Sequence, residues 1–81
     1  MEIVVDCYGV TERLAGGPEH VIALRPGARI ADLLDALAHR WPELGRVLPG
    51  CACAVGDTVV SRTRALAPGE RLALLPPVSG G

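Results

Sequence analysis

One amphipathic segment near the middle of this chain constrains its fold more than any other feature. Apolar side chains recur there with the spacing of helical turns, which places them along one face of a helix. These residues are Ile30, Leu33, Leu34, Leu37 and Trp41. Asp32 lies in the first turn of that helix and His39 and Arg40 in the last, where the helix dipole favours each charge. We therefore predict one main helix over residues 30–41, ended by Pro42, whose apolar face must pack against another element.

The segments around this helix alternate apolar and polar residues with the period of half-buried strands. Strands are expected at residues 2–8, 20–24, 51–55, 58–60 and 71–75. Turn residues lie after the second predicted strand at Arg25-Pro26-Gly27, between the third and fourth at Gly56-Asp57, and before the last at Pro68-Gly69. Residues 10–14 allow one further helical turn. This order predicts an α+β domain in which a mixed sheet of four or five strands curls around the helix. If the first and last strands are neighbours, the chain leaves the domain from the sheet centre.

Length and composition limit the chain to one small domain of 81 residues, with enough hydrophobic residues (49%) for a packed core. The net charge is −1 and the charges are interspersed, which argues against nucleic acid as a partner because nucleic-acid binding needs clustered positive charge. No apolar run approaches the roughly 18 residues of a membrane span, and no basic segment marks a signal peptide. We expect a soluble cytoplasmic protein without a membrane partner.

The three cysteines do not suggest a secreted disulfide scaffold, because their number is odd. Cys7 shares a strand face with Ile3 and Val5, which favours packing in the core. Cys51 and Cys53 are two residues apart, on one face of a strand, but no further metal ligand lies nearby in the sequence. We expect reduced thiols that pack as small hydrophobic side chains and no metal site, and a further role of Cys51 and Cys53 stays open.

The two histidines, His20 and His39, each stand alone. No motif places a Ser or Cys beside either of them, so surface or capping roles are favoured over catalysis. Trp41 is expected to close the end of the core between helix and sheet.

The end of the sequence differs in composition from the predicted domain. Its residues are Pro76, Pro77, Val78, Ser79, Gly80 and Gly81. The two prolines have a fixed φ and no N–H, so they cannot extend a sheet and they keep the chain extended. Two glycines without Cβ atoms can enter a channel too narrow for other residues, and nothing crowds the terminal carbonyl. We predict a domain over residues 1–75 and an extended, flexible tail over residues 76–81 whose Gly81 carboxylate is the working group. The competing interpretation is a frayed end without function.

The last residues of this sequence resemble the C-terminus of the small, sulfur-carrying subunit of molybdopterin synthase, a MoaD/ThiS-like family of ubiquitin-like proteins. They read Leu74-Leu75-Pro76-Pro77-Val78-Ser79-Gly80-Gly81. The similarity extends to Leu14-Ala15-Gly16, Ile30-Ala31-Asp32-Leu33-Leu34, Ala54-Val55 and Leu66-Ala67-Pro68-Gly69-Glu70. This family has the β-grasp fold with the same element order, so the resemblance implies that fold here.

The resemblance also implies a chemistry and a set of partners. An E1-like enzyme would use ATP to adenylate the Gly81 carboxylate, and a desulfurase or rhodanese-type donor would convert the adenylate to a thiocarboxylate. Residues 76–80 would then bind inside the channel of the large synthase subunit, in an expected heterotetramer, where the sulfur attacks cyclic pyranopterin monophosphate. Leu74 and Leu75 would belong to the partner surface. The chain would not be a catalyst alone, and it would hold the adenylate and the thiocarboxylate only transiently, with no permanent cofactor.

Three other functions stay open at this point. The same carrier chemistry could serve the thiamin thiazole, cysteine or a sulfur-containing natural product. The chain could instead be a ubiquitin-like modifier that is joined to target lysines through Gly81. It could also be an interaction module in which the tail is incidental, and then loss of Gly81 would leave its function intact.

Overall fold

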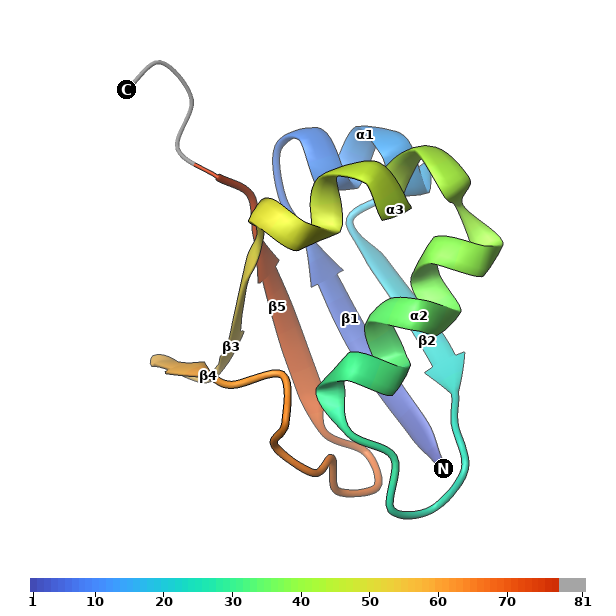
Figure 1. Ribbon diagram of the computed structural model, residues 1–81, viewed down its shortest axis with the longest axis vertical. Coiled ribbons are helices and arrows are strands. Elements are labelled where there is room, and N and C mark those ends of the chain that lie inside the picture. The colour runs from blue at the N-terminus through green and yellow to red at the C-terminus, as the bar shows by residue number, and fades with distance from the viewer. Residues whose placement is uncertain (78–81) are drawn as a thin grey trace.

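The computed structural model describes residues 1–77, which form five strands and a set of short helices (Figure 1). In chain order these are β1 (Glu2–Cys7), α1 (Val10–Ala15), β2 (Glu19–Ala23), α2 (Ile30–Arg40), α3 (Pro42–Val47), the 3₁₀ turn η1 (Leu48–Gly50), β3 (Ala52–Val55), β4 (Thr58–Val60) and β5 (Arg71–Leu75). The predicted strands and main helix are confirmed to within one or two residues at their ends. The sequence analysis did not predict α3 and η1.

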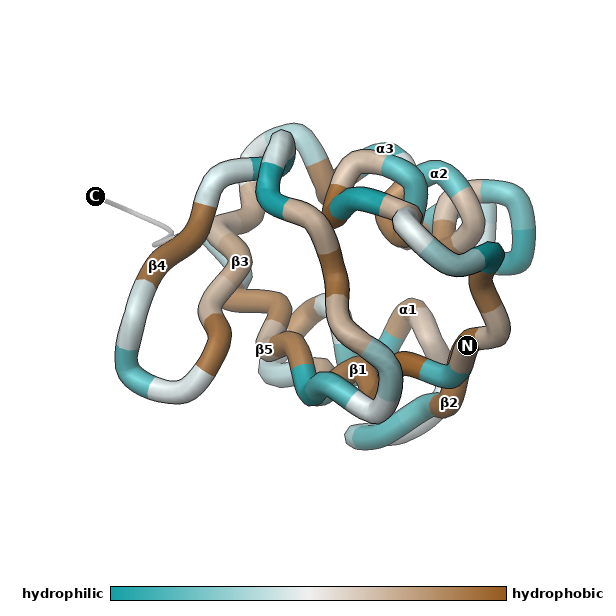
Figure 2. The backbone as a smooth tube through the Cα atoms, turned by 90° about the horizontal axis from the view of Figure 1, so that it is seen from below, coloured by the Kyte–Doolittle hydropathy of each residue, from teal (hydrophilic) through white to brown (hydrophobic). Residues whose placement is uncertain are grey.

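The five strands form one mixed sheet in the order β2-β1-β5-β3-β4. β1 and β5 pair in parallel, and all other neighbours are antiparallel. The first and last strands therefore lie side by side within the sheet, as expected. Figure 2 shows α2 and α3 on one side of β1 and β5, which leaves the other face of these strands without a helical cover. This is the β-grasp arrangement that the resemblance implied.

The core lies between this sheet and α2. Alternate residues of β1 and β5 point toward the helix, and the predicted apolar stripe of α2 points back at them. The largest side chains with almost no exposure are Ile3, Val5, Ile30, Leu33, Leu37, Leu44, Leu72 and Leu74. Trp41 is half-buried against this cluster, so its predicted place at the edge of the core is confirmed.

Pro42 ends the main helix and also begins α3, which the sequence analysis missed. Proline lacks an N–H, which a first helical residue does not need, so it fits the start of α3. α3 has only six residues and one buried side chain, Leu44, so it carries no recognisable periodicity. It packs closely on α2 at Gly45, where a Cβ atom would lie only 2.8 Å from the Cβ atom of Ala38.

The loop between β4 and β5 caps the start of α2. The N–H groups of Ile30 and Ala31 have no partner within the helix, and they donate to the carbonyl oxygens of Arg64 (3.0 Å) and Arg62 (2.9 Å). The Asp32 carboxylate accepts a further hydrogen bond from the Arg29 N–H, at 2.8 Å. The helix is thus held at its start by residues that are distant in sequence.

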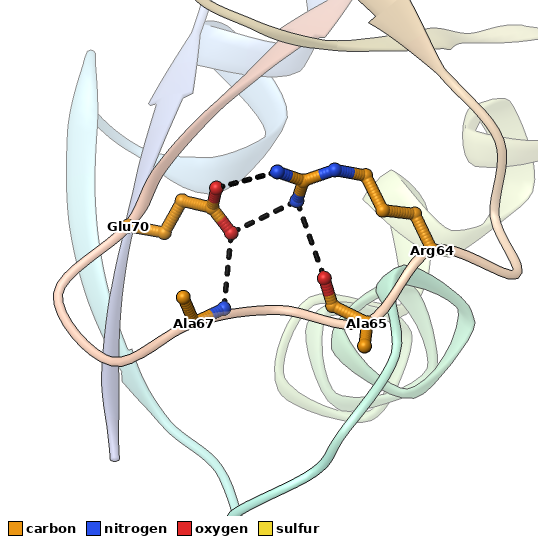
Figure 3. Close-up of polar contacts among 4 residues, drawn as sticks. All are labelled: Arg64, Ala65, Ala67 and Glu70. Carbon is orange, nitrogen blue, oxygen red and sulfur yellow. Dashed lines mark hydrogen bonds and ion pairs between the residues drawn. The ribbon is translucent and has the colours of Figure 1, made fainter.

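An ion pair between Arg64 and Glu70 clamps the same loop (Figure 3). Two guanidinium nitrogens of Arg64 donate to the two carboxylate oxygens at 2.9 and 2.8 Å, and the Ala67 N–H donates to Glu70 Oε1 at 3.0 Å. The hydrogen bonds from Arg64 and Ala67 lower the pKa of Glu70 to about 2. The expected turn at Pro68-Gly69 is confirmed inside this clamp, with φ of 77° at Gly69 and a hydrogen bond from the Glu70 N–H to the Ala67 carbonyl.

Replacement of Glu70 by Gln is expected to lower the free energy of unfolding by about 1 kcal/mol at pH 7, because the charge-assisted pair is lost. A carboxyl with a lowered pKa in the folded state stabilises the fold above its unfolded pKa, near 4.5 here. That contribution is lost as the pH falls toward about 2, so the two proteins should converge in stability between pH 5 and pH 2. Urea denaturation across this range measures the difference.

Glu43→Gln is the matched control, because Glu43 and its partner Arg46 are both largely exposed and 3.7 Å apart. That substitution should change the stability by less than about 0.5 kcal/mol at any pH. A Glu70→Gln difference that stays constant down to pH 2 would contradict the assignment.

Candidate functional site

The site predicted from the sequence begins where the chain leaves β5. This strand lies between β1 and β3, and its last residue, Leu75, pairs with Ala52 of β3. Pro76, directly after the end of β5, is half-buried, and Pro77 is exposed (Figure 1). The predicted site residues Val78, Ser79, Gly80 and Gly81 lie outside the described residues. Their assigned roles stay predictions.

Two glycines from other segments lie beside these prolines. Gly9 follows β1, and a Cβ atom at Gly9 would lie 3.4 Å from Pro76 Cγ. Gly50 ends η1, and a Cβ atom there would lie 3.6 Å from Pro77 Cγ. The sequence analysis did not identify either glycine, because no motif connects them to the prolines and only the sheet order brings these segments together.

Hydrogen bonds hold both glycine segments in place. The Thr11 hydroxyl is fully buried, accepts from the Tyr8 N–H at 2.9 Å and donates to the Tyr8 carbonyl at 2.7 Å, which closes the loop that contains Gly9. On the other side, the Arg62 guanidinium donates to the carbonyls of Leu48 (2.8 Å), the first residue of η1, and Cys51 (3.0 Å), the residue that follows it.

The predicted partner surface is wrong for Leu74, which has 0% exposure. Side chains alternate along β5, so Leu72 and Leu74 face the helices, whereas Arg71, Ala73 and Leu75 face the opposite side of the sheet. Leu74 lies in register with Cys7 on one neighbouring strand and with Cys53 on the other. Leu75 is 36% exposed, so it alone of the two leucines is available for contact with a partner.

The open face of the sheet carries a small ionic network beside apolar residues. Arg71 donates to Asp6 at 2.6 Å and to Glu19 at 2.8 Å, across three neighbouring strands. A shallow concavity next to this network is lined by Asp6, Tyr8, Ala54, Val55, Gly56, Arg71 and Ala73. Tyr8 and Val59 are exposed large hydrophobic residues. A face of this kind, with apolar residues around paired charges, is suited to contact with another protein.

The three cysteines are buried, as expected for packing residues. Burial is the main cause that raises the pKa of each thiol, which keeps all three protonated at neutral pH. The Cys51 thiol also donates to the Val47 carbonyl at 3.3 Å. Within residues 1–77, no group of three or more His, Cys, Asp and Glu side chains is arranged to hold a metal ion.

The histidines differ in their surroundings. His39 is exposed and its Nδ1 lies 2.9 Å from the Asp35 carbonyl, in line with the expected role near a helix end. The expected surface position of His20 is wrong, because its ring packs against Trp41 with 4.6 Å between the ring centroids. The Arg40 guanidinium also lies over the Trp41 ring, 4.7 Å from its centroid, so these three side chains form a cluster beside the core.

Among the helices of residues 1–77, none has the length and apolar character needed to cross a membrane.

Comparison with known proteins agrees with this fold. The ThiS family matches residues 5–81. The molybdopterin synthase sulfur carrier subunit of Chlamydomonas reinhardtii is 32% identical over the whole length of both chains. Among solved structures, SAMP1 from Haloferax volcanii, a small archaeal modifier protein, has a TM-score of 0.87 at 27% identity, with all of both chains covered. Subunits 1 and 2 of the molybdopterin-converting factor of Helicobacter pylori have been solved as a complex, and a chain of it matches with a TM-score of 0.69 at 26% identity, again over all of both chains.

The family match covers nearly the whole sequence, and the full-length relative exceeds 30% identity. The five-stranded sheet wrapped around α2 is the fold of these structural neighbours. This chain therefore belongs to the ThiS family, the small β-grasp proteins of the MoaD/ThiS type.

Proposed function

We propose that this protein is a sulfur carrier of molybdenum cofactor (molybdopterin) biosynthesis and that its working group is the Gly81 carboxylate. The position of Pro76 and Pro77 carries the proposal. They follow directly on β5, which lies between two other strands of the sheet, and the tail begins there. Prolines have no N–H to donate to a further strand, so the pairing of β5 does not continue through them. Four more residues reach at most about 14 Å, enough to enter the active site of a partner. The full-length similarity to the Chlamydomonas sulfur carrier subunit supports the same function.

The chemistry of this carrier requires activation, because a carboxylate is a poor electrophile. An E1-like enzyme joins the Gly81 carboxylate to the AMP part of ATP and releases pyrophosphate. The terminal sulfur of a persulfide on a desulfurase or rhodanese-type donor then displaces AMP, which leaves with one carboxyl oxygen. A thiol reductant cleaves the resulting acyl disulfide, so that the carbonyl carbon keeps one oxygen and one sulfur. The thiocarboxylate sulfur is a good nucleophile and attacks cyclic pyranopterin monophosphate. The chain supplies the sulfur, and its partners supply the catalytic groups.

The proposed acceptor complex contains a molybdopterin synthase large subunit. The Helicobacter pylori complex of subunits 1 and 2 supports a partner of this kind. Leu75, Tyr8 and the open sheet face lie near the exit of the tail and are the exposed surface we assign to this contact. Residues 76–80 would then bind inside the channel of the large subunit, in a heterotetramer of two small and two large subunits.

Incubation with the adenylating enzyme, ATP and a sulfur source is expected to raise the intact mass of the protein by the difference between one sulfur and one oxygen atom. A reaction without ATP is the control, because it leaves the carboxylate inactive. An unchanged mass, with the enzyme shown to be active on another carrier, would overturn the carrier function and favour an interaction module. Stable complex formation with a molybdopterin synthase large subunit would separate molybdopterin synthesis from a carrier role for thiamin thiazole, cysteine or a natural product.

A second candidate function is protein modification, which the similarity to the archaeal modifier SAMP1 favours. Activation of Gly81 would begin in the same way, but an amine of a target lysine would displace AMP and form an isopeptide bond. Conjugates of higher mass that contain this chain and resist reductant would identify a modifier.

A further inference from the structure

We propose that Gly9 and Gly50 form a seat for Pro76 and Pro77, and that this exit seat sets the direction in which the tail leaves the domain. At both glycines, the place where other residues carry a Cβ atom lies within 3.4 to 3.6 Å of a proline Cγ atom. A bulky side chain at Gly9 or Gly50 would therefore crowd the space that the neighbouring proline ring occupies. The inference rests on the proposed function, to which it adds the residues that position the reactive end.

The seat is built on supported backbone rather than on free loops. Gly9 has φ of 55° and ψ of −126°, a conformation open to glycine, and the buried Thr11 hydroxyl binds both backbone groups of the preceding Tyr8. Gly50 lies between two carbonyls that the Arg62 guanidinium holds at 2.8 and 3.0 Å. Two supported segments from different parts of the chain thus lie beside successive prolines.

When Pro76 and Pro77 are held in the exit seat, the tail loses less conformational entropy on insertion into the partner channel. A tail free to pivot at residue 75 samples many directions, and only the fraction that points into the partner channel can react, so the apparent affinity falls by that fraction. Loss of the seat should therefore raise KM for the adenylating enzyme and leave kcat almost unchanged. The free-energy cost of fixing the backbone of about one residue corresponds to roughly a 10-fold change in kcat/KM.

Gly50→Val is the first test, in the full-length protein with the adenylating enzyme, ATP and a sulfur source. Gly50 has no left-handed φ, and the two methyl groups of valine add bulk to a Cβ position that lies 3.6 Å from Pro77 Cγ. We expect a KM about 10-fold higher with unchanged kcat. Gly50→Ala is the matched control, because its Cβ atom makes only an ordinary contact at 3.6 Å. The double variant Gly50→Val/Pro77→Ala removes the crowded ring and should recover part of the loss.

Gly9→Leu tests the other side of the seat, with Gly56→Leu as its control. Both glycines have positive φ, 55° and 61°, so both positions disfavour a side chain. A Cβ atom at Gly9 would lie 3.4 Å from Pro76 Cγ, so the larger leucine side chain should crowd the ring, whereas a Cβ atom at Gly56 would meet nothing within 4 Å. Equal KM values for these two leucine variants would overturn the role of Gly9 in the seat.

An NMR measurement separates failure of the seat from failure of the proposed function. Nuclear Overhauser contacts between the Gly50 Hα atoms and the Pro77 ring are expected in the wild-type protein and should weaken in Gly50→Val. If the contacts are present but no thiocarboxylate forms, the carrier function fails and the seat stands as a structural element. If the contacts are absent, or if Gly50→Val has the KM of Gly50→Ala, the exit seat is overturned.

Discussion

Deletion of Gly81 is expected to abolish thiocarboxylate formation and sulfur transfer while leaving the melting temperature of the domain unchanged. The deleted residue carries the carboxylate that we propose to be adenylated, and the remaining chain would present the reactive group one residue, about 3.5 Å, short of its place in the partner. The buried core that the structure describes ends at Leu74, so the fold does not depend on the deleted residue. Intact mass after activation and a thermal denaturation curve measure the two effects separately.

Two further variants sharpen this experiment. A variant with one alanine added after Gly81 should be as inactive as the deletion variant. The addition converts the Gly81 carboxylate to a peptide amide and places a side chain at the new C-terminus. Glu43→Gln leaves the whole tail unchanged and is the control, expected to retain most of the activity, because Glu43 is largely exposed and lies outside the predicted site. Normal cofactor synthesis by the deletion variant would contradict the carrier mechanism and favour an interaction module with an incidental tail.

Leu37→Ala is expected to lower the free energy of unfolding by roughly 2–5 kcal/mol, because it leaves a cavity in the core. Leu37 has 0% exposure and lies on the face of α2 that packs on the sheet. For a domain of this size, that loss is a large fraction of a total stability of about 4–12 kcal/mol. Urea denaturation at pH 7 measures the change directly.

Activity should fall in Leu37→Ala only through loss of folded protein, so that activity per folded molecule stays near that of the wild type. Val59→Ala is the control, because Val59 is 66% exposed and loses little burial. We expect it to change the stability by less than about 0.5 kcal/mol. A Leu37→Ala cost below about 1 kcal/mol would mean that α2 does not pack on the sheet in solution as described.

Local pattern was enough to predict most of the fold. The apolar stripe from Ile30 to Leu37 repeats with the helical period, and strands alternate with period two, so each element carries its own signal. The turn at Pro68-Gly69 was equally predictable, because proline and glycine restrict or permit particular φ values on their own. α3 was missed because a six-residue helix with one buried side chain has no period to detect.

The candidate site was predictable only in its chemistry. The run of prolines and glycines from residue 76 can be read directly, because the special property of each residue lies in its own backbone or in a missing side chain. The partner surface was not predictable from the sequence, and the sequence analysis wrongly placed Leu74 on it. Leu74 and Leu75 are equally apolar, and one is buried and the other exposed only because successive side chains of β5 point to opposite faces of the sheet.

The sequence by itself thus determined the main helix, the strands and the nature of the tail, since these follow from interactions between residues close together in the chain. Tertiary structure alone decided that the tail starts beside Gly9 and Gly50 and that Arg62 supports its exit. These contacts join segments that are far apart in sequence. They depend on the parallel pairing of β1 with β5 and on the position of η1 next to β3, and no local pattern encodes such a pairing.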